Sequence, residues 1–143
     1  GDEAGYTPLL PMFTLGHDFK PANIHAGGLR YHGAGMIISQ LVKDGYMHGV
    51  DVAQTEAFEA GMLFARVEGI IPAPESCHAI AATIREAKKA TEEGKNTVIL
   101  FCLSGHGLID MPSYESYLNG DLHDYRVSDE EINKFLQTVP QVD

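Results

Sequence analysis

Residues 96–110 read NTVILFCLSGHGLID, an apolar run that stops abruptly at a glycine-rich turn. The run 97–103 is rich in residues that favour strands, so it predicts a strand buried on both faces, as inside a parallel sheet. Ser104 places a hydroxyl where that strand ends, and Gly105 and Gly107 let the backbone turn and approach a ligand closely. Ligands of open α/β sheets bind beyond the carboxyl ends of strands, so Ser104 is a candidate site residue, with an ordinary turn as the alternative.

The sequence on either side of this run predicts alternating helices and strands. Helices are expected at 34–44, at 55–67, at 77–92 with Ser76 as N-cap, and from Ser128 onward, with a short strand at 46–53. This order predicts an α/β, three-layer fold with a partly parallel sheet. Residues 1–35 carry many glycines and prolines and predict an irregular segment that wraps other structure, ahead of an α/β part at 36–143.

Composition limits the class of protein. A chain of 143 residues with 44% hydrophobic residues is long enough for one domain with a core. A formal net charge of −10 argues against nucleic acid or an anionic membrane surface as a partner. Cys77 and Cys102 fit reduced, buried thiols of a cytoplasmic protein. The chain begins at Gly1 and not at methionine, which suggests a segment of a longer protein.

Three familiar kinds of site are not supported. A serine-hydrolase elbow around Ser104 would need glycine at Cys102 and at His106. The Gly33-Ala34-Gly35 turn has no preceding strand and is a weak dinucleotide signal. The seven histidines show no ligand pair at helical spacing, which argues against a metal site built from them.

Residues 68–79 read EGIIPAPESCHA and place two carboxylates around a rigid apolar turn. Glu75 comes just before a predicted helix and next to prolines, so it is a candidate acid or base. The alternative is that Glu75 only complements the positive end of the helix dipole, and the residues themselves favour that interpretation.

Three stretches together resemble the tryptophan synthase beta subunit family. These are EGIIPAPESCHA at 68–79, LSGHGLID at 103–110 and HAGGLRYHG at 25–33, in the order and spacing of the family. Pro74 and the GLRYHG run make the sequence most similar to the second branch of that family. The resemblance extends over almost the whole chain and corresponds to the C-terminal third or so of such a subunit.

The resemblance implies a fold type II enzyme that depends on pyridoxal 5′-phosphate (PLP). Ser104 is then expected to face the pyridine nitrogen of PLP, with Gly105, His106 and Gly107 in the loop beside the ring. A serine hydroxyl donates to an unprotonated ring nitrogen, which moderates the electron sink and favours β-replacement. Glu75 matches the active-site glutamate of the family.

Further expectations follow from the same resemblance. The backbone carbonyls of Tyr31 and Gly33 are expected to help hold a monovalent cation. Arg30 replaces an aspartate of the main branch, which puts the closing of the site and coupling to an α-subunit in question.

The implied reaction joins L-serine and indole into L-tryptophan in a cytoplasmic homodimer. The Schiff-base lysine and the phosphate-binding loop of the family are expected upstream of Gly1, so the isolated chain is expected to be inactive. Two alternatives stay open: a non-catalytic binding or interaction domain, and another fold type II lyase of the serine or threonine dehydratase kind.

Overall fold

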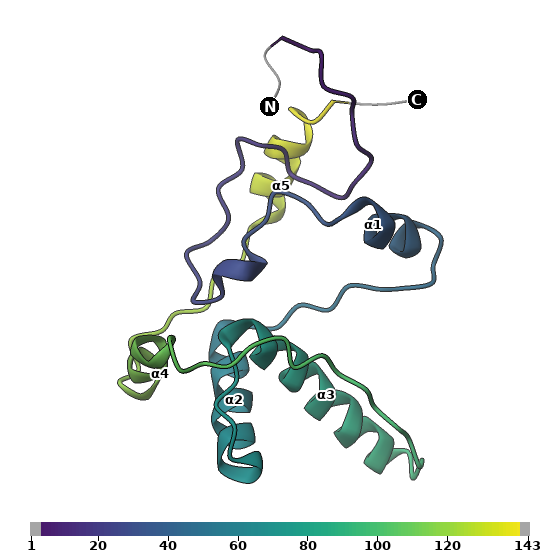
Figure 1. Cartoon of the computed structure of the whole chain (residues 1–143). Helices are drawn as coiled ribbons and strands as arrows, with labels where there is room; N and C mark the ends of the chain where they lie inside the picture. The colour runs from purple at the N-terminus through teal and green to yellow at the C-terminus, as the bar shows by residue number, and fades with distance from the viewer. Residues whose placement is uncertain (1–3, 141–143) are drawn as a thin grey trace. The chain divides into compact units, whose positions relative to one another are not determined.

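The computed structural model describes residues 4–140, which form helices joined by long irregular segments (Figure 1). The helices are η1 (Gly27–Leu29, a 3-10 helix), α1 (Met36–Lys43), α2 (Gln54–Glu68), α3 (Pro74–Glu92), α4 (Met111–Leu118) and α5 (Asp129–Leu136).

The described chain gathers into two compact units. The first contains residues 4–22, Arg30–Gly49 and 126–140, and therefore α1 and α5. Inside it, the rings of Phe19 and Phe135 meet edge to face with centroids 5.2 Å apart. The second unit contains Asn23–Leu29 and Val50–Tyr125, and therefore η1, α2, α3 and α4.

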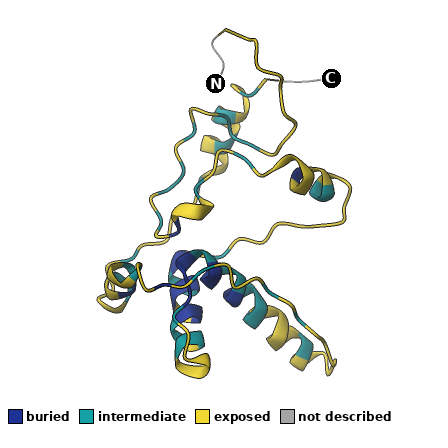
Figure 2. Ribbon diagram, viewed as in Figure 1, coloured by how far each residue is buried: buried dark blue, intermediate teal, exposed yellow. Residues whose placement is uncertain are grey.

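The core of the second unit lies between α2 and the first half of α3 (Figure 2). Small residues of α2 allow the close approach of the two helices. A Cβ atom added at Gly61 would lie only 2.5 Å from the Cys77 sulfur. The residues that share this interface are buried: Ala57, Phe58, Ala60, Cys77, Ile80, Ala81 and Tyr114.

The helix ends follow local signals, with one correction. The Ser128 hydroxyl accepts a hydrogen bond from the backbone N–H of Glu131 at 3.2 Å, so the helix that was predicted from Ser128 onward begins with this cap. The predicted start of α3 at residue 77 is wrong, because the helix already begins at Pro74. Proline is pre-organised for the first helical position, which leaves Ser76 inside the first turn and free for another role.

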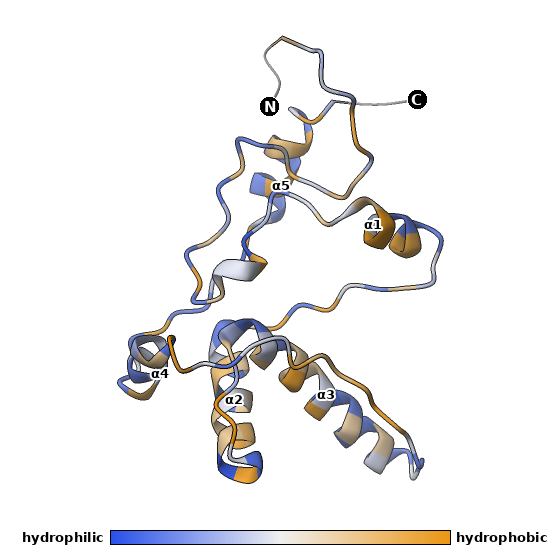
Figure 3. Ribbon diagram, viewed as in Figure 1, coloured by the Kyte–Doolittle hydropathy of each residue, from blue (hydrophilic) through white to orange (hydrophobic). Residues whose placement is uncertain are grey.

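None of the residues 4–140 forms a strand, so the partly parallel sheet is not confirmed, and residues 46–53 and 97–103, which were expected as strands, are irregular in this chain. Residues 97–103 run as an apolar trace beside α3 (Figure 3). Phe101 packs on the α2–α3 core, but Val98 and Leu100 are 99% and 95% exposed. A strand needs a neighbour for its backbone N–H and C=O groups, and no described segment of this chain supplies one.

The two cysteines have different surroundings. Cys102 is exposed, so the expectation that both thiols are buried is wrong for this residue. Cys77 is completely buried, and its sulfur lies 3.3 Å from the Tyr114 hydroxyl, which donates to the Pro72 carbonyl at 2.7 Å. Burial raises the pKa of the Cys77 thiol and also that of the Tyr114 hydroxyl.

We expect the free energy of unfolding to fall at alkaline pH because of this pair. Both groups keep their protons to a higher pH in the folded chain than in the unfolded chain, where they ionise near their ordinary pKa values of 9.0 and 10.0. The stabilisation from these two groups is therefore complete below about pH 9 and is lost as the pH rises toward their folded-state pKa values. Each group that keeps its proton only in the folded chain lowers the free energy of unfolding by up to about 1.4 kcal/mol per pH unit.

Urea unfolding between pH 7.5 and 10.5 measures this effect. A Cys77→Ala, Tyr114→Phe double variant serves as the comparison, and its free energy of unfolding should depend less steeply on pH. Equal slopes for the two proteins above pH 9 would show that this pair does not cause the loss.

Candidate functional site

The motifs at 68–79 and 103–110 come together through their backbones. Pro72 and His106 form an isolated antiparallel bridge. The Ala73 N–H donates to the Gly105 carbonyl at 2.9 Å, and the Gly107 N–H donates to the Ile71 carbonyl at 2.8 Å. We call this contact the motif junction. It holds the turn after the apolar run against the turn before α3.

Only glycine fits at position 107, because the backbone of the 68–79 motif passes too close for a side chain. A Cβ atom at Gly107 would lie 2.4 Å from the Pro72 carbonyl oxygen, whereas one at Gly105 would lie 3.1 Å from the Ala73 Cβ. The glycines of the SGHG turn thus admit a neighbouring backbone of the same chain, a use that was not predicted from the sequence.

Ser104 is exposed at this junction and is held from inside by Ser76. The Ser76 hydroxyl oxygen accepts hydrogen bonds from the backbone N–H groups of Ser104 at 3.1 Å and Gly105 at 3.2 Å. The two serine hydroxyl oxygens lie 3.1 Å apart. The sequence predicted Ser76 only as a helix cap, and its role in the loop was missed.

Glu75 lies in the first turn of α3, where its charge suits the helix dipole. Its Oε1 atom accepts a hydrogen bond from the backbone N–H of Gly28 in η1 at 2.7 Å. Gly28 belongs to the third motif, HAGGLRYHG, so this contact joins the beginning of that motif to the other two. A Cβ atom at Gly28 would lie 3.0 Å from Glu75 Oε1, whereas one at Gly27 would meet nothing within 4 Å.

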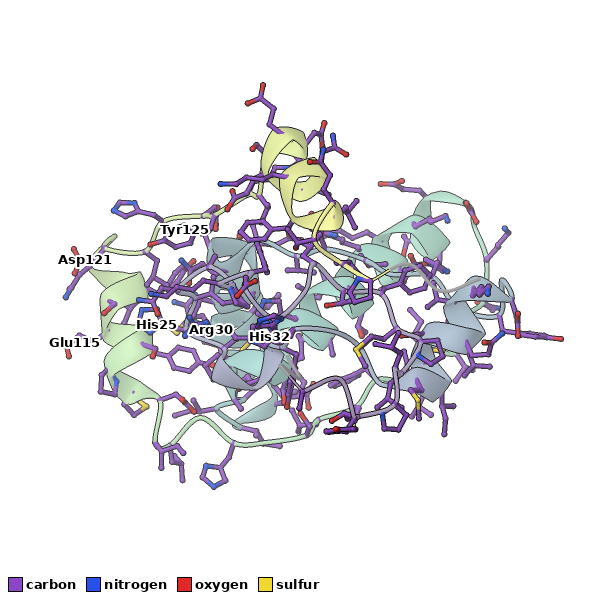
Figure 4. All side chains as sticks on the ribbon, turned by 90° about the horizontal axis from the view of Figure 1, so that it is seen from above. His25, Arg30, His32, Glu115, Asp121 and Tyr125 are labelled. Atoms are coloured by element: carbon purple, nitrogen blue, oxygen red, sulfur yellow. The ribbon has the colours of Figure 1, made fainter. Side chains whose placement is uncertain are left out.

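The segment before η1 is held in place by α2 and α4. The His25 Nδ1 atom lies 2.9 Å from the Ser113 hydroxyl of α4. Figure 4 shows His25 beside α4, with Glu115 on the outer side of that helix. The buried Gln54 accepts from the His25 N–H at 3.4 Å and donates to the His123 carbonyl. Sequence reasoning missed Gln54, although a polar residue at the start of an apolar helix is a signal for such a role.

The residues expected at a cation site lie in the first unit. Gly33 forms an isolated antiparallel bridge with Thr14, and Tyr31 is 70% exposed. The Arg30 guanidinium donates to the Pro21 carbonyl at 3.3 Å within the same unit. Among the described residues, no group of three or more His, Cys, Asp or Glu side chains is placed to hold a metal ion.

The structure also contains a cavity away from the motifs. Its volume is about 630 Å³, and it is lined by residues of α2 and α3 together with Tyr117 and Leu118 of α4. None of the predicted site residues lines it. The converging backbone and side-chain contacts favour the motif junction as the site.

The sequence matches curated proteins over most of its length. Tryptophan synthase beta chain 2 of Thermotoga maritima is 64% identical over 114 residues, which are 80% of this chain and 27% of the relative. The protein of the same name from Pyrococcus furiosus is 54% identical over 140 residues, which are 98% of this chain and 31% of the relative. Over the matched residues, the chain belongs to the tryptophan synthase beta chain family.

The match confirms the resemblance that the three motifs indicated. Aquifex aeolicus has a further tryptophan synthase beta chain 2 that is 57% identical over 124 residues, or 29% of its length. The chain thus spans about a third or less of the curated tryptophan synthase beta chains that it matches. No family model matches the chain. In the part of the chain that the structure describes, the helices are too short or too polar to cross a membrane.

Proposed function

We propose that this chain is the C-terminal part of a tryptophan synthase beta chain and contributes one side of its PLP-dependent active site. The reaction would join L-serine and indole into L-tryptophan. The observation that carries the proposal is the junction at which three family motifs meet, with the Ser104 hydroxyl and the Glu75 carboxylate on it. When bound, PLP supplies the electron sink that allows the serine side-chain oxygen to be replaced by a carbon of indole.

The residues of the junction fit a pyridine ring. Ser104 is exposed and neutral, so it can donate a hydrogen bond to an unprotonated ring nitrogen without imposing a charge. Gly105 and Gly107 let the loop pack closely against Ala73 and Pro72, which holds Ser104 at the edge of the junction. We propose Ser104, Gly105, His106 and Gly107 as the cofactor side of the site.

Glu75 is proposed as the acid–base group. Its Oε1 atom is engaged by the Gly28 N–H, which fixes the orientation of the carboxylate. The Oε2 atom is then the oxygen that accepts or returns a proton of the reacting molecules. A positioned carboxylate of this kind typically contributes ~10²–10⁴-fold to a rate.

The proposal extends to features that the family resemblance implies. The carbonyls of Tyr31 and Gly33 would help hold a monovalent cation, and the complete protein would be a cytoplasmic homodimer. Residues 97–103 would pair with strands of the complete enzyme, which is supported by the exposure of Val98 and Leu100.

A chimera tests the proposed function. The segment of the Thermotoga maritima relative that aligns with this chain is replaced by residues of this chain. The chimera should bind PLP and form L-tryptophan from L-serine and indole. The unmodified relative and the relative without that segment are the positive and negative controls. A folded chimera that binds PLP but makes no more tryptophan than the negative control would favour a non-catalytic domain instead.

We also expect that the 143-residue chain alone forms no specific covalent adduct with PLP. A lysine that reacts with PLP needs a desolvated or cationic pocket, whereas every lysine of this chain is exposed. These are Lys20, Lys43, Lys88, Lys89, Lys95 and Lys134. Borohydride reduction followed by peptide mapping should find weak labelling spread over several lysines. A one-to-one adduct at a single lysine would refute this expectation.

A further inference from the structure

We propose that Ser76 is a positioning residue that fixes Ser104 as a hydrogen-bond donor toward the cofactor ring, an inference that rests on the proposed function. Ser76 is only 1% exposed and therefore cannot itself reach a ligand. Within residues 4–140, its hydroxyl forms hydrogen bonds with Ser104 and Gly105, the two residues that open the SGHG turn.

Counting donors and acceptors decides the direction of the Ser76–Ser104 hydrogen bond. A serine hydroxyl has one proton to donate and two lone pairs that accept. Both lone pairs of Ser76 are used, because its oxygen accepts from the N–H groups of Ser104 and Gly105. The Ser104 hydroxyl therefore has no lone pair of Ser76 to donate to, and Ser76 must be the donor of this pair.

The Ser76 proton has two acceptors within reach. The Ser104 oxygen lies at 3.1 Å, and the Gly105 carbonyl oxygen lies at 3.5 Å. Hydroxyl donors prefer acceptors near 2.8 Å, so the closer oxygen is favoured. The Gly105 carbonyl also accepts from the Ala73 N–H at 2.9 Å, so it keeps a donor when Ser76 donates to Ser104.

The consequence concerns the proton of Ser104. Because Ser104 accepts from Ser76 on its inner side, its own proton is left to point toward the exposed side of the junction. Such a hydroxyl binds a neutral aromatic nitrogen, which accepts a hydrogen bond, better than a protonated pyridinium, which can only donate. Ser76 would thus select the protonation state of the ring without touching it.

The first test measures amide hydrogen exchange in the 143-residue chain without a cofactor. Ser76→Ala should accelerate exchange about tenfold at the amides of Ser104 and Gly105, as expected for the loss of one hydrogen bond each. Ser104→Ala should leave the Gly105 amide protected, because the Ser76 oxygen remains. Ser116→Ala is the control, since that hydroxyl bonds the Pro112 carbonyl within α4.

Amides of α2 serve as an internal reference for folding in this experiment. If Ser76→Ala also abolishes the protection of the α2 amides, the Ser76→Cys variant is used in place of Ser76→Ala. A thiol is close in volume to the serine hydroxyl but is a weak hydrogen-bond acceptor. Unchanged exchange at both loop amides in a folded Ser76 variant would overturn the inference.

The second test uses the PLP-loaded chimera and the ¹⁵N chemical shift of ring-labelled PLP. Ser104→Ala should shift the ring-nitrogen signal and weaken PLP binding by a few-fold to about tenfold. Ser76→Ala should shift the signal in the same direction, and Ser116→Ala should not. A shift with Ser104→Ala but not with Ser76→Ala would overturn the inference and leave the proposed function intact. Bound PLP whose ring nitrogen responds to neither variant would overturn both.

Discussion

Glu75→Gln in the chimera is expected to lower kcat by ~10²–10⁴-fold while PLP affinity stays within about twofold. The glutamine side chain keeps an oxygen that accepts from the Gly28 N–H, as Glu75 Oε1 does at 2.7 Å. It removes only the ability to take up and return a proton. Steady-state kinetics with L-serine and indole, together with PLP titration, measure the two quantities separately.

Glu68→Gln is the matched control for this substitution. Glu68 flanks the same turn at the end of α2, but it is exposed and takes part in none of the contacts of the junction. Its replacement should leave turnover unchanged. If Glu75→Gln weakens PLP binding as steeply as turnover, the carboxylate holds the structure together and is not an acid–base group.

The contact with Gly28 offers a second way to examine the same carboxylate. Gly28→Ala would bring a methyl group to 3.0 Å from Glu75 Oε1, so the carboxylate would have to move. We expect lower turnover from Gly28→Ala and no change from Gly27→Ala, whose methyl group would meet nothing within 4 Å. Equal turnover in these two variants would show that the position of the carboxylate does not limit the rate.

Gly107→Ala is expected to destabilise the motif junction by about 2–4 kcal/mol. The new Cβ atom would lie 2.4 Å from the Pro72 carbonyl oxygen and 3.0 Å from Ile71 Cγ2, and backbone atoms have little freedom to yield. The hydrogen bond from the Gly107 N–H to the Ile71 carbonyl would be lost with the displacement. Urea unfolding followed by circular dichroism measures the change.

Two other glycines calibrate that result. A Cβ atom at Gly105 would contact the Ala73 Cβ at 3.1 Å, so Gly105→Ala should destabilise the chain less than Gly107→Ala. Gly49→Ala adds a methyl group with nothing within 4 Å and should change stability by less than about 0.5 kcal/mol. A Gly107→Ala variant as stable as Gly49→Ala would show that the junction is loose.

The sequence alone predicted the parts of this chain whose signals are local. The helices at α2 and α5 follow from apolar periodicity and from the Ser128 cap, since these act over one or two turns. The start of α4 carries a comparable signal in Pro112, which lies in its first turn, but the missing apolar periodicity concealed it. The three motifs identified the family because their residues and order are specific.

Tertiary structure alone decided how the site is assembled. Ser76 contacts Ser104 across 28 residues, and Glu75 contacts Gly28 across 47 residues. A residue pattern cannot state which donor meets which acceptor at such separations, because that depends on how the whole chain turns back on itself. The same reason explains why residues 97–103 were predicted as a strand. Their β propensity is a local property, whereas a strand exists only where another segment satisfies its backbone.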